Sequence, residues 1–143
     1  MSLNNVLGIS GSGMSVQSVR LNTIASNIAN ADSVSSSAGT AYKARTPVFA
    51  AAMQGVGHTV YPSQDEAIGV QVLGIVESDA PSTAVFNPSH PLADKDGMVY
   101  GSNVKMMDEM ANMIAASRSY QDNVEVATTV QQLLLKTLSI GQG

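Results

Sequence analysis

The chain has 143 residues, of which 13% are charged, with 7 Lys and Arg against 11 Asp and Glu and a net charge of −4. This balance argues against nucleic acid as the main ligand, because phosphate binding is driven by Lys and Arg. The lack of cysteine excludes disulfides, thiolate catalysis and Cys-ligated zinc. No targeting segment is visible and no apolar run approaches the ~20 residues of a membrane span. We therefore expect a cytosolic protein, or one exported without a cleavable signal.

Residues 3–31 are predicted to form a helix, because they contain no proline and repeat large apolar residues every seven positions. Arg20 is their only charged residue, whereas an ordinary amphipathic helix has a charged outer face. Contact with protein on several sides is the favoured interpretation, and a core helix of a self-contained bundle is the alternative. The predicted seam alternates large and small residues at Leu7, Gly11, Met14, Ser18, Leu21, Ala25 and Ile28.

Residues 33–102 are predicted to form a small β-rich insert. They contain all five prolines, and their β-branched runs predict strands at 42–53, 69–77 and 83–86. Residues 87–97 are rich in Pro, Asp and Gly and predict turns and loops. A short-stranded insert of this size is stable chiefly when something packs against it.

Residues 103–140 lack both proline and glycine and predict a second long helix, with Ser102 or Asn103 as its N-cap. The methionines at 106, 107, 110 and 113 form either an adaptable interface or ordinary core. Helices this long exceed what the insert can cover, so they are expected to cover each other and then other chains. The seam positions predicted for this helix are Ile114, Val124, Leu134 and Leu138.

No catalytic, cofactor-binding or metal site is predicted, because no nucleophile, base and orienting group come together in the sequence. The glycines around Ser12 fit helix packing better than a phosphate loop. The Asp94–Gly97 segment is predicted to be a turn, since it lacks the later Glu of a calcium loop. An enzyme stays an alternative only if His58, His90 and Asp94 cluster in a pocket.

The segment from Ile9 to Ser33 resembles the N-terminal region of bacterial flagellar axial proteins. In that family Arg-Leu-Asn/Asp precedes Ala-x-Asn-Ile/Leu-Ala-Asn, and the matching residues here are 20–22 and 25–30. The segment with Asn87-Pro88, Pro91–Asp94 and Gly97 resembles the proximal rod members of the family. The C-terminal matches are Glu109-Met110, Ala116–Tyr120, Asn123-Val124 and Leu135–Leu138.

The resemblance implies an α+β fold in which the terminal helices pair as an antiparallel coiled coil with the β-rich insert outside. The expected segments are 1–32 for the N-terminal helix, 33–102 for the insert and 103–143 for the C-terminal helix. The implied function is that of a structural subunit of the flagellar rod, which polymerises helically, crosses the periplasm, conducts export and transmits torque. The implied partners are copies of itself, other proximal rod proteins, the adaptor near the MS ring, the distal rod and the flagellar type III export apparatus.

No nucleic acid, cofactor or small-molecule substrate is expected. The terminal helices are predicted to complete their burial only on joining the rod. The alternative function is a helical-hairpin adaptor that docks a single partner in a secretion-related assembly. The residues predicted to contact neighbouring subunits are Arg20, Asn27, Asn30, Arg118 and Tyr120.

Overall fold

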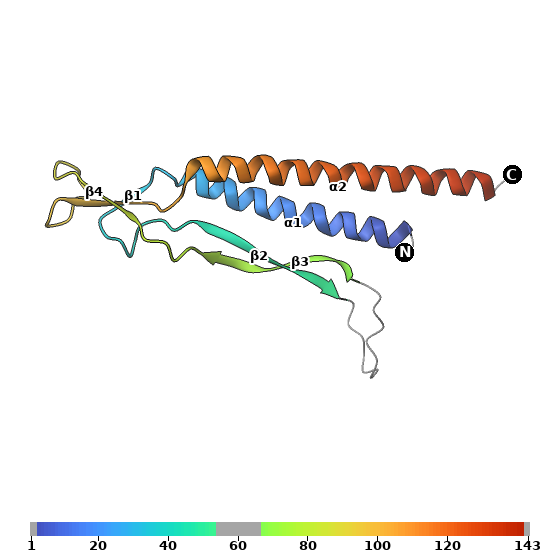
Figure 1. Cartoon of the computed structure of the whole chain (residues 1–143), viewed down its shortest axis with the longest axis horizontal. Helices are drawn as coiled ribbons and strands as arrows, with labels where there is room; N and C mark the ends of the chain where they lie inside the picture. Colours follow the sequence, from blue (N-terminus) through green and yellow to red (C-terminus); the bar gives the residue numbers. More distant parts are fainter. Residues whose placement is uncertain (1–2, 54–66, 142–143) are drawn as a thin grey trace, which may run out of the picture. The chain divides into compact units, whose positions relative to one another are not determined.

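The computed structural model describes residues 3–53 and 67–141. A long helix stands at each end of the described chain, with a small β-rich insert between them, so the predicted α+β class is confirmed (Figure 1). None of the described helices is long and apolar enough to cross a membrane. The elements in chain order are α1 (Leu3–Ala29), β1 (Val34–Ser35), β2 (Arg45–Met53), β3 (Ala67–Glu77), β4 (Thr83–Phe86), β5 (Met98–Gly101) and α2 (Met106–Gly141).

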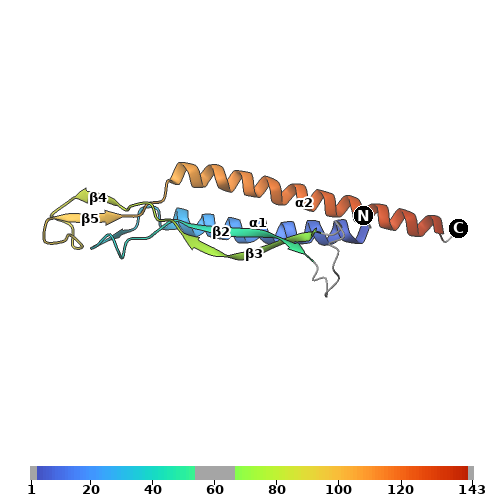
Figure 2. The ribbon, with the colours of Figure 1, turned by 60° about the horizontal axis from the view of Figure 1, so that its bottom comes forward.

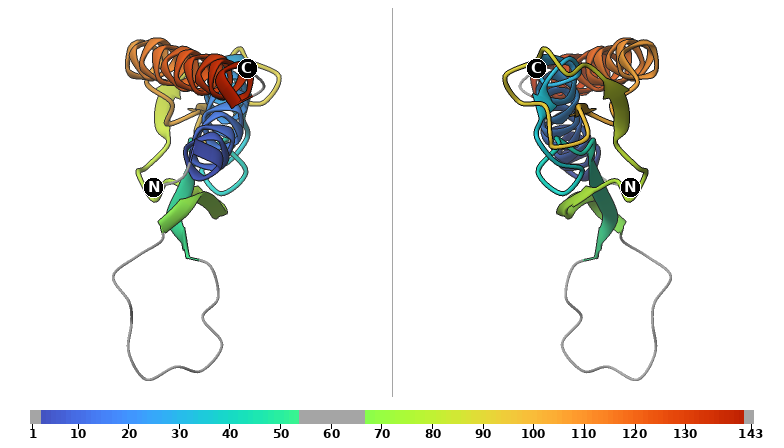
Figure 3. Two further views of the ribbon diagram at one scale, coloured as in Figure 1. Left: turned by 90° about the vertical axis from the view of Figure 1, so that its right-hand side faces the viewer. Right: turned by 90° about the vertical axis from the view of Figure 1, so that its left-hand side faces the viewer.

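The chain divides into two compact units, each of which contains part of α1, β2, β3 and α2. The first comprises the described parts of residues 1–19, 48–74 and 116–143, and the second comprises residues 20–47 and 75–115. Within the first unit, α1 lies between α2 and the paired strands β2 and β3 (Figure 3). The predicted division into segments 1–32, 33–102 and 103–143 stays a prediction.

Helix α1 ends at Ala29, two residues before the predicted end, because Asn30 closes it. The Asn30 side chain donates from Nδ2 to the Ser26 carbonyl at 2.8 Å, and the same carbonyl accepts the Asn30 backbone N–H at 3.2 Å. Ser33 donates from its hydroxyl to the Asn30 carbonyl at 2.7 Å. The chain therefore leaves the helix through a turn fixed by side chains.

Helix α2 begins at Met106, so the predicted start at 103 and the predicted N-cap residues were wrong. Ser102 accepts the Val104 N–H at 3.0 Å instead. Asn103 accepts the Ala44 N–H on Oδ1 at 2.6 Å and donates from Nδ2 to the Ala80 carbonyl at 2.8 Å. Because these side chains bond other groups, they do not cap the helix, and α2 begins about one turn later than predicted.

Strand β5 lies between β1 and β4 in a three-stranded antiparallel sheet (Figure 2). Strand β4 coincides with the predicted strand at 83–86, and β2 and β3 fall within two or three residues of the other two predictions. Strands β1 and β5 were not predicted. They are short, and their pairing with each other joins residues far apart in the sequence.

Asp94 fixes the loop between β4 and β5, and this loop confirms the predicted turn. Its Oδ1 accepts the N–H groups of Met98 at 2.8 Å and Asp96 at 2.9 Å, and its Oδ2 accepts the Tyr100 hydroxyl at 3.0 Å. The bond from the Met98 backbone, with help from the Tyr100 hydroxyl, lowers the pKa of Asp94 below its usual value. The hydrogen bond that the Tyr100 hydroxyl donates to Asp94 raises the pKa of Tyr100.

Asn27 joins α1 to the start of β2. Its side chain is 1% exposed. Its Oδ1 accepts the Arg45 N–H at 2.9 Å and the Tyr42 hydroxyl at 3.1 Å, and its Nδ2 donates to the Arg45 carbonyl at 2.8 Å. The amide therefore satisfies both backbone groups of Arg45, as a neighbouring strand would.

Replacing Asn27 with alanine should destabilise the chain, because the Arg45 N–H loses its buried acceptor. We expect Asn27→Ala to lower the free energy of unfolding by about 1–3 kcal/mol, measured by urea denaturation. The control Asn22→Ala, at an exposed position of the same helix, should change it by less than about 0.5 kcal/mol. Equal losses in the two variants would contradict this role.

Gly97 should resist substitution, since its φ is +76° and a β-carbon there would lie 2.9 Å from Cε2 of Phe86. We expect Gly97→Ala to destabilise the β4–β5 hairpin by about 1–3 kcal/mol. Hydrogen exchange of the β4 and β5 amides measures this local stability. Gly39→Ala is the matched control, because nothing lies within 4 Å of the corresponding β-carbon position. Unchanged exchange in the Gly97 variant would refute the expectation.

Candidate assembly surface

Gly13 is the point of close approach between α1 and α2 in the first unit. A β-carbon at residue 13 would lie 2.8 Å from Oδ1 of Asn123. The Asn123 side chain is itself held, because its Nδ2 donates to the Ser119 carbonyl at 2.8 Å. Nothing lies within 4 Å of the β-carbon position of Gly11, the glycine chosen from the sequence. The close approach of the helices therefore depends on Gly13.

Ser12, next to Gly13, attaches α1 to β3. Its hydroxyl donates to the Ile9 carbonyl at 2.8 Å and accepts the Val70 N–H at 3.1 Å. Neighbouring residues of α1 thus contact α2 on one side and the β2–β3 pair on the other.

An open hollow of about 320 Å³ lies between α1 and α2 in the first unit. It collects four of the predicted seam residues from two helices that are distant in the sequence. Leu7 and Val124 are exposed within it, while Met14 and Leu134 are half-buried. Its lining residues are Leu7, Met14, Val124, Ala127, Thr128, Gln131 and Leu134.

The other predicted seam positions range from half-buried to exposed. Leu21, Ile28 and Gly11 are half-buried, whereas Ser18 and Ala25 are exposed. On α2, Ile114 is 71% exposed and Leu138 is also exposed. The most buried positions of α1 are instead Ser10, Val16, Thr23, Ile24 and Asn27.

The sequence did not predict that Ser10, Val16 and Thr23 are buried, because the seam prediction followed large apolar residues seven positions apart. Asn27 was predicted as a subunit contact. The buried positions of α1 also recur at helical spacing, but three of them are polar: Ser10, Thr23 and Asn27. Small polar residues on a helix are ordinarily assigned to its outer face. The one available signal was the near absence of charge around α1, which fits a helix covered on more than one side.

The residues predicted to contact neighbouring subunits have different surroundings. Arg20 donates from Nη2 to Oδ1 of Asn112 at 3.4 Å. Asn30 closes α1, and Asn27 is buried against Arg45, so the structure gives both a role within the chain. Arg118 and Tyr120 are exposed on α2, and neither side chain has a hydrogen bond to another described residue.

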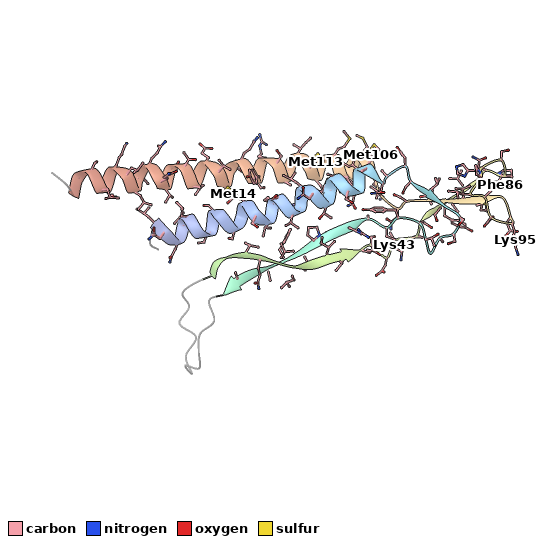
Figure 4. All side chains as sticks on the ribbon, turned by 180° about the vertical axis from the view of Figure 1, so that it is seen from behind. Met14, Lys43, Phe86, Lys95, Met106 and Met113 are labelled. Carbon is pink, nitrogen blue, oxygen red and sulfur yellow. The ribbon has the colours of Figure 1, made fainter. Side chains whose placement is uncertain are left out.

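The first turns of α2 carry an exposed apolar patch, which we call the methionine patch and define as Met106, Met107, Met110 and Ile114. Met107 is 77% exposed, and the other three side chains are also exposed. Figure 4 shows Met106 at the beginning of α2 and Met113 farther along it. The sequence left open whether these methionines form core or interface. In the described chain the patch is not core.

The described residues contain no group of three His, Asp or Glu side chains placed to hold a metal ion. His90 lies in the loop after β4, where its Nδ1 accepts the Leu92 N–H at 3.1 Å. His58 lies outside the described residues. The clustering of His58, His90 and Asp94 that an enzyme would need therefore stays untested.

Comparison with known proteins identifies the family. The family described as "Flagella basal body rod protein" matches residues 7–35, and "Flagellar basal body rod FlgEFG protein C-terminal" matches residues 95–140. The flagellar basal-body rod protein FlgC of Yersinia enterocolitica is 49% identical over 99% of this chain and 100% of its own length. The FlgC proteins of Salmonella typhimurium and Buchnera aphidicola subsp. Schizaphis graminum are 46% and 43% identical, with the same coverage of both chains. The chain, whose matched regions include most of both long helices, belongs to the FlgC family of flagellar basal-body rod proteins.

Proposed function

We propose that this chain is a structural subunit of the proximal rod of the bacterial flagellar basal body. It polymerises helically through its terminal helices and forms part of a tube that transmits torque and conducts exported proteins. Full-length similarity to FlgC proteins supports this function. The observation that carries the mechanism is the exposure of large apolar side chains along α2, among them Met107, Ile114 and Ile140.

Assembly supplies the burial that the separate chain lacks. Ordering one residue costs about 1–2 kcal/mol of backbone entropy, and a helix offsets this cost mainly by burying an apolar face. Neighbouring subunits that cover the apolar side chains of α2 return about 25 cal/mol per Å². The helices are therefore weakly held before assembly and rigid within the rod.

The predicted seam and contact residues take defined places in this proposal. The hollow lined by Leu7, Met14, Val124 and Leu134 receives side chains from a neighbouring subunit, and Ile114 and Leu138 are covered by further neighbours. Arg118 and Tyr120 contact adjacent subunits, since neither side chain is hydrogen-bonded to a described residue of the same chain. Arg20 and Asn30 already make hydrogen bonds within the chain. They contact neighbouring subunits only through the polar atoms that these bonds do not use.

The partners in this proposal are copies of the chain itself, other proximal rod proteins, the adaptor near the MS ring and the distal rod. The subunit acts as a structural protein without catalysis. It reaches the periplasmic space through the flagellar type III export apparatus without a cleaved signal peptide. The support for these points is its membership of a rod-protein family.

Leu21 gives a direct test, because it is half-buried on α1 while its neighbour Asn22 is exposed. In a motile bacterium whose own rod gene is replaced by this one, Leu21→Asp should abolish rod assembly and swimming. A charge on the apolar side of α1 opposes burial between subunits. Asn22→Asp adds the same charge at the exposed neighbour and should leave swimming intact.

Hydrogen exchange of the β4 and β5 amides should be the same in both variants, which separates lost assembly from lost folding. A motile Leu21→Asp strain would refute helical polymerisation through this seam. A purified wild-type chain that forms only a complex of fixed stoichiometry with one partner would favour the adaptor function instead.

A further inference from the structure

The sheet formed by β1, β5 and β4 has one edge closed by the chain itself. On the side of β5 that faces β1, the Ser102 N–H donates to the Ser33 carbonyl at 3.2 Å. Farther along that side, the Asp94 N–H donates to the Met98 carbonyl at 2.9 Å, and Asp94 Oδ1 accepts the Met98 N–H at 2.8 Å. The loop from Asp94 thus closes the edge where β1 has already ended.

The opposite edge, along β4, is open. The Asn87 N–H donates to the Gly97 carbonyl at 2.9 Å, and Phe86 is paired with Met98 in the next register position. Antiparallel ladders alternate hydrogen-bonded and non-bonded pairs. The N–H and C=O groups of Ala84 and Phe86 therefore point away from β5, and no described residue bonds them.

Strand β4 also lacks the features that normally protect an edge. Proteins block such edges with lysine, proline, bulges or inward-pointing charges. The sequence Thr-Ala-Val-Phe contains none of these, and all four of its residues are exposed. Phe86 is 68% exposed and lies at the far end of the hairpin (Figure 4). The flanking Pro81 and Pro88 confine an added ladder to this short stretch.

The chemistry of this edge specifies its occupant. Main-chain pairing requires an extended segment with free N–H and C=O groups, and β4 presents apolar side chains on both faces of the sheet. A suitable segment is therefore short, uncharged and apolar on alternate residues. Residues 73–76 of β3, Leu-Gly-Ile-Val, have this character, and Leu73, Ile75 and Val76 are all exposed.

Strand β3 is itself short of a partner. It belongs to a sheet of two strands, so one of its edges carries no strand in the described part of the chain. A two-stranded sheet is marginally stable in water, and a third strand stabilises it. The chain thus has two strand edges, on β4 and β3, that carry apolar side chains and lack a neighbouring strand. Each edge could provide the main-chain N–H and C=O partners for the other.

We propose that the edge of β4 pairs with residues 73–76 of β3 from a second copy of the chain. This inference rests on the proposed rod function. A contact between two different surfaces repeats head to tail and builds a ring or an open helical polymer, whereas β4 pairing with β4 would close a symmetric dimer. The strand pairing adds a directional, main-chain link between subunits to the burial provided by the helices.

Disulfide trapping tests the pairing cleanly, because the chain contains no cysteine. Rods are purified from cells whose only copy of the gene carries Ala84→Cys together with either Leu73→Cys or Ile75→Cys. Mild oxidation should then give a ladder of linked multimers on a non-reducing gel. Each single-cysteine variant should remain monomeric, since its partner strand offers no thiol.

Rods that form normally but give no ladder with either pair would overturn the inference and leave the proposed function intact. Dimers from Ala84→Cys alone would also overturn it, because they show β4 paired with β4. If even the unsubstituted chain fails to enter basal bodies, the proposed function fails and this inference fails with it.

A backbone variant provides a second measurement that does not depend on cysteine geometry. Ala84→Pro removes an N–H that points away from β5, so the β4–β5 ladder should persist and the Val99 amide should exchange at its normal rate. The number of assembled rods per cell should fall roughly tenfold, because each subunit contact loses a backbone hydrogen bond. Ala84→Thr keeps the N–H and should assemble normally. Equal rod numbers in the two variants would contradict the pairing.

Discussion

The burial of apolar surface is the constraint on which the rest of this structure depends. Helix α2 is 36 residues long, and its side chains Met107, Ile114 and Ile140 are between 71% and 79% exposed. Few apolar residues in the described chain are buried, and four of the six are alanine or valine at single points on α2 and in the insert. A chain that orders such helices without covering them gains little stability from them. The buried apolar residues are Val16, Ile24, Ala41, Val99, Ala116 and Val130.

Polar side chains define the local geometry where apolar packing is thin. Asn27 fixes the start of β2, Asn103 bonds the backbone of Ala44 and Ala80, and Asp94 fixes the β4–β5 loop. Each satisfies two or more polar groups, and Asn27 and Asn103 do so at distant points of the chain, so these bonds specify the fold as well as stabilise it. This arrangement specifies the insert and its junctions with the helices while leaving apolar surface available to neighbouring subunits. A rod subunit that folds partly before assembly benefits from that separation of roles.

The sequence predicts the elements set by local pattern and misses those set by distant partners. Both helices and the strand at 83–86 follow from periodicity and from the positions of proline. Strands β1 and β5 do not, because two to four residues carry little pattern of their own and their pairing with each other spans most of the insert. Asn103 was mistaken for a helix cap because its bonds to Ala44 and Ala80 are not visible in the sequence. Asn27 was predicted to contact a neighbouring subunit, whereas the fold brings Arg45 of the same chain to it.

Hydrogen exchange of the purified, unassembled chain, compared with the same chain in isolated basal bodies, tests the central claim most directly. We predict fast exchange of the α2 amides in the free chain, and the fastest exchange around the exposed side chains Leu135, Leu138 and Ile140. The amides of β5 and the Arg45 amide, which is bonded by Asn27, should be protected. Assembly should then slow exchange throughout α2. Strong protection of α2 in the free chain, unchanged in basal bodies, would contradict the account, because it would mean that the helices complete their fold without neighbours.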